Sequence, residues 1–93
     1  MQMFGKYRGM VMGIEDPLQM GRLLVQVPAL GEGQFWALPC IVGAGRDSGH
    51  LVIPPVGAMI WIEFEGGDTA SPIWAGGFWQ SGERPRSIEW QPS

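Results

Sequence analysis

Residues 53–77 restrict the possible folds more than any other segment, because they have the pattern of a long β-hairpin. In residues 59–65, apolar and other side chains alternate: Ile60, Ile62 and Phe64 point one way, and Trp61, Glu63 and Glu65 the other. Because successive side chains of a strand face opposite sides, this alternation predicts an extended strand with one buried face. A Gly-Gly-Asp turn at residues 66–68 follows, and a second arm runs over residues 73–79.

Three further strands are predicted before the hairpin, at residues 7–14, 22–27 and 35–41. In the second of them, Leu23, Val25 and Val27 share one face, and Pro28 ends the strand because it has no amide hydrogen for the ladder. With 15 Gly and 8 Pro, no window has helical periodicity. Residues 42–56 are predicted to be a loop that can hold a short extended piece at residues 50–53.

Five short strands separated by turns predict an all-β protein. At this size we expect a small five-stranded barrel of the oligonucleotide/oligosaccharide-binding (OB) type, with an SH3-like barrel as the alternative. The barrel is expected over residues 1–80, and residues 81–93 are expected to form an extended C-terminal tail or to lie on a partner.

The apolar content indicates that this chain meets a partner. Only 16% of its 93 residues are charged, whereas it contains five Trp, four Phe and six Met, more than a small core can hide. Strand parity places the last two barrel tryptophans on opposite faces, so one belongs to the core and the other is available. The predicted interface residues are Trp61, Glu63, Trp74, Trp79, Ile88 and Trp90.

Charge and residue types argue against several functions. The net charge of −3 disfavours binding to a phosphate backbone. A free OB module that binds single-stranded nucleic acid or a glycan remains the alternative function. Cys40, His50 and Asp47 could suggest a nucleophile with a base, but a lone Cys at a strand end is more often packed in a core. We therefore predict no enzyme activity, no cofactor and no metal site.

The remaining sequence features concern turns and the cellular compartment in which the chain is made. Asp16 and Asp68 are predicted to accept hydrogen bonds from nearby backbone amides in turns. A single cysteine excludes an internal disulfide and fits a reducing compartment. The N-terminus lacks the apolar stretch of a signal peptide, and no apolar run is long enough to span a membrane, so synthesis in the cytoplasm is expected.

Four motifs occur in order along the chain. The first is GKYRG at residues 5–9, and the second is DP at 16–17 followed by GRLLVQVP at 21–28. The third is WA at 36–37 before PC at 39–40, and the fourth combines PVG at 55–57, IWIEFEGGD at 60–68 and PIWAG at 72–76. Together they resemble the OB-fold domain of phage baseplate hub and spike proteins. That domain is shared by the tail-lysozyme spike of contractile phages, the spikes of type VI secretion systems and baseplate assembly proteins of the V type. The resemblance covers about residues 5–80.

This resemblance implies a structural protein of the virion, located in the tail baseplate of a contractile phage or in a related injection apparatus. It implies a homotrimer that joins the central hub to the membrane-piercing spike. Many relatives continue into a lysozyme domain or a β-helical needle, and this sequence contains neither. The resemblance therefore implies an adaptor whose spike tip is a separate protein, with a membrane contacted only through that spike.

Overall fold

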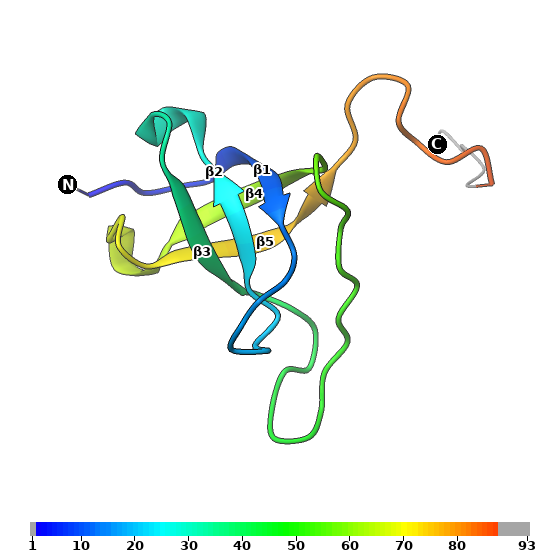
Figure 1. The fold of residues 1–93 in the computed structure, drawn as a ribbon, viewed down its shortest axis with the longest axis horizontal. Coiled ribbons are helices and arrows are strands. Elements are labelled where there is room, and N and C mark those ends of the chain that lie inside the picture. The colour runs from blue at the N-terminus through cyan, green and yellow to red at the C-terminus, as the bar shows by residue number, and fades with distance from the viewer. Residues whose placement is uncertain (1, 88–93) are drawn as a thin grey trace.

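Five β-strands form a closed barrel in the computed structural model, which describes residues 2–87 (Figure 1). The strands are β1 (Tyr7–Gly13), β2 (Leu23–Gln26), β3 (Gln34–Pro39), β4 (Met59–Phe64) and β5 (Pro72–Phe78). Around the barrel their order is β1-β2-β3-β5-β4, and β4 closes it against β1. All neighbours are antiparallel except β3 and β5, which are parallel. The predicted all-β five-stranded barrel is confirmed, and it is consistent with an OB fold.

Helical structure in residues 2–87 consists of two three-residue 3₁₀ turns, η1 (Pro28–Leu30) and η2 (Glu65–Gly67). No helix in this part of the chain is both long enough and apolar enough to cross a bilayer. The η2 turn joins the hairpin arms where the Gly-Gly-Asp sequence predicted a turn. Gly66 and Gly67 have φ of 58° and 82° there, a conformation in which glycine carries no Cβ penalty.

The barrel core follows the predicted alternation. In β4 the side chains of Ile60, Ile62 and Phe64 are buried, while the intervening side chains are half-buried on the outer face. The register places Ile60 of β4 opposite Gly9 of β1, and the Ile62 side chain fills the space over this glycine, where an added Cβ would lie 2.7 Å from Ile62 Cγ1. Among residues 2–87, the buried hydrophobic cluster consists of Val11, Leu23, Val25, Val27, Ala37, Ile60, Ile62, Phe64 and Trp74.

A β-bulge interrupts the pairing of β4 with β5. Ile60 pairs with Gly77 and Ile62 pairs with Trp74, so the one residue between them on β4 faces two residues on β5. The second of these two, Gly76, has φ of 100°, in the region that favours glycine. The bulge shifts the alternation of β5 by one residue, and Phe78 therefore pairs with Met59 on the outer face.

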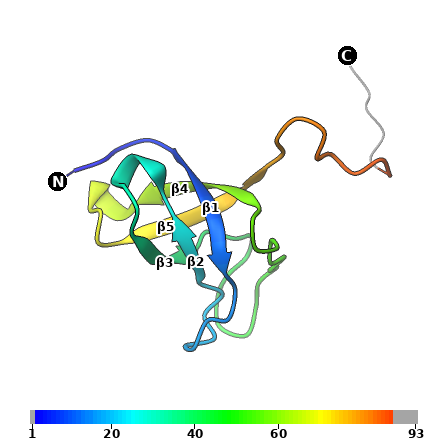
Figure 2. The ribbon, with the colours of Figure 1, turned by 45° about the horizontal axis from the view of Figure 1, so that its top comes forward.

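Two irregular segments leave the barrel (Figures 1 and 2). The β3–β4 loop, residues 40–58, projects from one end of the barrel, and residues 50–53 within it belong to no strand. Its ordered feature is a tight turn in which Gly45 and Ser48 exchange backbone hydrogen bonds. The second segment, residues 79–87, follows β5 and runs away from the barrel in both views.

Candidate assembly surface

An aromatic cluster covers the outside of the barrel where β1, β4 and β5 lie side by side. The rings of Trp61 and Phe78 are 4.5 Å apart between centroids and tilted by 33°. The Arg8 guanidinium lies 5.1 Å from the centroid of Phe78 and 5.8 Å from that of Trp61, close enough for cation–π attraction. The neighbouring pair Met10 and Met59 extends the same surface. We call these five residues the aromatic face.

The aromatic face includes Trp61, one of the predicted interface residues. Trp61 is half-buried, because Phe78 and Arg8 cover part of its ring, and the rest of the indole faces outward. Glu63 lies two residues further along the same side of β4, and its carboxylate is 3.6 Å from the Lys6 ammonium. Both groups are well exposed, so this ion pair contributes little stability. Sequence parity alone did not identify Phe78 and Arg8 as parts of this face.

The structure places the two barrel tryptophans in different environments. Trp74 is only 4% exposed and belongs to the core, so its place among the predicted interface residues is corrected. Its indole N–H donates a 3.0 Å hydrogen bond to the Gly21 carbonyl, which uses its polar atom within the chain. Trp79 is 54% exposed, just after β5. Ile88 and Trp90 lie outside the described residues.

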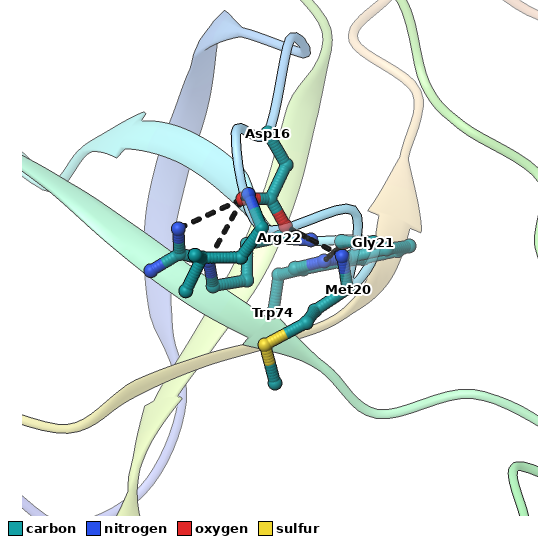
Figure 3. A network of polar contacts seen from close by, with 6 residues as sticks. Asp16, Met20, Gly21, Arg22 and Trp74 are labelled. Atoms are coloured by element: carbon teal, nitrogen blue, oxygen red, sulfur yellow. Dashed lines mark hydrogen bonds and ion pairs between the residues drawn. The ribbon is translucent and has the colours of Figure 1, made fainter.

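The β1–β2 loop is organised around the Asp16 carboxylate (Figure 3). This carboxylate accepts hydrogen bonds from the backbone N–H groups of Leu18, Met20 and Arg22, at 2.9 to 3.0 Å. It also accepts two from the Arg22 guanidinium, at 2.8 and 3.0 Å. The predicted turn role of Asp16 is thus confirmed, and so is that of Asp68, which accepts from the Ala70 N–H at 2.9 Å.

Asp16 forms a tight ion pair. Its side chain is 5% exposed, and that of Arg22 is 18% exposed. The Arg22 guanidinium beside it holds the pKa of the Asp16 carboxyl well below its usual range, and the three backbone N–H donors act in the same direction against the opposing effect of burial. The loop tip is therefore fixed while Leu18 and Met20, 61% and 51% exposed, project from it.

The β3–β4 loop adds further exposed aliphatic side chains. They are Val42, Leu51, Val52, Ile53 and Val56, with exposed fractions from 43% to 85%. Cys40, at the start of this loop, is exposed, so the prediction that it is packed in the core was wrong. The reason is alternation: Ala37 is buried and Leu38 is exposed, so Cys40, three residues after Ala37, lies on the outward side, while Ile41 packs against the core. Asp47 and His50 are also on the surface of this loop.

No three His, Cys, Asp or Glu side chains gather among residues 2–87 as metal ligands would. What this part of the chain does present is apolar surface on a small rigid barrel: the aromatic face, the tip of the β1–β2 loop and the β3–β4 loop. Such surfaces are typical of protein–protein interfaces.

Comparison with known proteins assigns this barrel to a family. The family model described as the type VI secretion system/phage-baseplate injector OB domain matches residues 7–79, from the first residue of β1 to the residue after β5. A comparison with curated proteins found no match. The family match spans the whole barrel and agrees with its strand topology. The chain belongs to the family of type VI secretion system and phage-baseplate injector OB domains.

Proposed function

We propose that this chain is a structural adaptor of a contractile phage tail baseplate or a related injection apparatus. Three copies would surround the tail axis and join the central hub to a separate membrane-piercing spike protein. The observation that carries this proposal is the family match over residues 7–79, which implies assembly partners in a baseplate. The protein would act mechanically and catalyse no reaction.

The barrel has the properties that such a role requires. A closed barrel leaves no long unpaired strand edge, so it resists both deformation and unwanted strand addition. The aromatic face offers large, preorganised rings for contact with a neighbouring copy, and interface hot spots are enriched in Trp and Arg. The exposed pair of Lys6 and Glu63 at its margin is suited to setting the register between copies rather than the affinity.

The mass of the purified chain in solution tests the proposal. We expect light scattering to give three times the chain mass of 10.2 kDa, over a range of concentrations. Co-expression with candidate hub proteins from the same particle is the second arm, and we expect the chain to co-purify with the hub in a threefold complex. A chain that stays monomeric at every concentration and also fails to bind any hub would contradict the adaptor.

A further inference from the structure

An open apolar groove lies between the start of β4 and the end of β5 and shares Met59 and Phe78 with the aromatic face. Its volume is about 930 Å³, within the range of sites that bind ligands. Glu83 is the single charged side chain among the lining residues, which are Pro54, Pro55, Val56, Gly57, Ala58, Met59, Gly77, Phe78, Trp79 and Glu83. Val56 and Trp79 are 59% and 54% exposed, so their apolar surface is left to a partner.

The C-terminal tail begins at the wall of this groove. After Trp79 the chain makes a turn in which the Glu83 carboxylate accepts a hydrogen bond from the Gln80 N–H, and the Glu83 N–H donates to the Gln80 carbonyl at 3.1 Å. From this turn the tail departs away from the barrel, and residues 81–87 are all exposed (Figures 1 and 2). Of tail residues 80–87, only Glu83 lines the groove, so the described tail leaves the rest of the groove uncovered.

The residues that follow Ser87 include large apolar side chains, which match the apolar lining of the open groove. Residues 81–87 contain no large apolar side chain, whereas the next three residues are Ile88, Glu89 and Trp90. A tryptophan provides 150–250 Å² of surface for burial, the largest contribution of any side chain. Residues 84–90 span at most about 24 Å when extended. This reach is comparable with the shortest dimension of the molecule, 26 Å, so the tail can cross to an adjacent copy.

We propose that the Ile88–Trp90 segment of one copy docks in the apolar groove of the neighbouring copy. This inference rests on the proposed homotrimer and specifies how its copies are joined. The tail of each copy binds the groove of the next copy, and this head-to-tail arrangement forms a closed ring of three copies. Glu83 holds the turn from which the tail leaves, and the groove offers exposed apolar surface at Val56 and Trp79 for the large side chains of this segment.

Cysteine cross-linking between two variants of the full chain tests this contact directly. Both variants carry Cys40→Ser, which removes the exposed native thiol. One also carries Val56→Cys in the groove, and the other carries Gln91→Cys beside the docking segment. After the two are mixed and mildly oxidised, any bridge between positions 56 and 91 joins two chains. A disulfide needs Cα atoms within about 7 Å, so only a docked tail gives it efficiently.

The matched control replaces Val56→Cys with Val42→Cys, which changes another exposed valine of the β3–β4 loop that lies outside the groove. We expect the 56–91 bridge to exceed the 42–91 bridge about tenfold, measured by peptide mass spectrometry. Equal yields would overturn the inference. A chain that carries both Val56→Cys and Gln91→Cys, and that bridges only within itself, would also overturn it, because the tail would then cover its own groove.

Light scattering of the unmodified chain separates this inference from the proposed function. A trimer without the 56–91 bridge would refute tail docking and leave the adaptor standing, whereas a bridge between chains supports docking whatever the hub arm shows.

If docking holds, Trp90→Ala weakens trimer association about thirtyfold, as loss of an interface hot spot does. Trp90→Phe, which keeps an aromatic ring, is expected to restore most of that affinity. An unchanged association constant for Trp90→Ala would refute the docked tryptophan.

Discussion

At the scale of single residues, Asp16 connects more of the barrel than any other polar side chain described. Its carboxylate binds three backbone N–H groups of its own loop and the Arg22 guanidinium at the start of β2. The same loop passes through Gly21, whose carbonyl accepts the indole N–H of Trp74 from β5 (Figure 3). One loop thus links β1, β2 and the core of β5, and holds its exposed tip in one position.

The ionised Asp16 makes the stability of the barrel depend on pH at the acid end. Since its pKa is lowered in the folded chain, its stabilisation is complete above the unfolded-state value of about 3.9 and is lost as the pH falls from there towards the folded-state value. We expect urea denaturation to show a lower midpoint at pH 3 than at pH 7. Asp16→Asn should lower the pH 7 midpoint and flatten this dependence; a variant as pH-sensitive as the wild type would argue against the role of Asp16.

The turn at Asp16 could be predicted from the sequence, because Asp-Pro is followed by amides within reach of a short carboxylate. The ion pair with Arg22 was not predicted. Six residues separate the two side chains, and no helical or strand period relates them, so their contact depends on the path of the whole loop. The sequence shows that both residues are present, but the contact between Asp16 and Arg22 depends on the tertiary structure.

At the scale of elements, β4 and β5 show where strand parity succeeds and where it fails. Parity assigned every inward residue of β4 correctly because that strand has no irregularity. In β5 strict alternation placed Phe78 on the same side as Trp74 and Trp79 on the opposite side. Trp79 is indeed exposed, but it follows the end of β5 and its exposure does not come from the parity of the strand. The bulge at residues 75–76 reverses the side of Phe78, which joins Trp61 outside the barrel. Neighbouring glycines are the local signal for such a bulge.

Gly76 provides a test of this bulge. A Cβ at this position would meet no atom within 4 Å, so any effect of Gly76→Ala comes from its φ of 100° rather than from a steric clash. We expect Gly76→Ala to lower the free energy of unfolding by about 1–2 kcal/mol.

The matched control is Gly13→Ala in β1, where φ is not positive and the nearest atom would be 3.4 Å away. That change is expected to be neutral or to stabilise by up to about 1 kcal/mol. Urea denaturation measures both, and equal effects would contradict this account.

At the scale of the whole molecule, the core of the barrel could be predicted from the sequence more fully than its outer surface. The core is aliphatic except for Phe64 and Trp74, and its pattern was readable from period-two alternation. The outer surface is where most of the remaining aromatic and aliphatic side chains lie, in patches that belong to different strands and loops. Composition predicted that such surface exists, but its location depends on barrel closure, which brings β1, β4 and β5 together.

The aromatic face makes a prediction about assembly. Trp61→Glu places a charge where the proposed neighbour packs, so we expect trimer association to weaken about thirtyfold or more while the barrel stays folded. Light scattering gives the association, and circular dichroism gives the fold. Trp36→Glu is the matched control, since Trp36 is also a half-buried outward tryptophan beneath an arginine, but on β3. Trp61→Glu chains that assemble as well as Trp36→Glu chains would remove Trp61 from the interface.

The parallel pairing of β3 with β5 also constrains how the protein is made. Leu38 pairs with Ile73, and the Cys40 N–H donates to the Trp74 carbonyl, so β3 and β5 are joined through contacts about 35 residues apart along the chain. On a ribosome, β1, β2 and β3 emerge long before β5, and the inner side of their small sheet stays open to water until the last strand arrives. A chain interrupted during translation before residue 72 would carry an uncovered apolar sheet and two free edges, a substrate for chaperones and proteases. The inner face of the sheet is therefore covered only once β5 has been made and has joined β3.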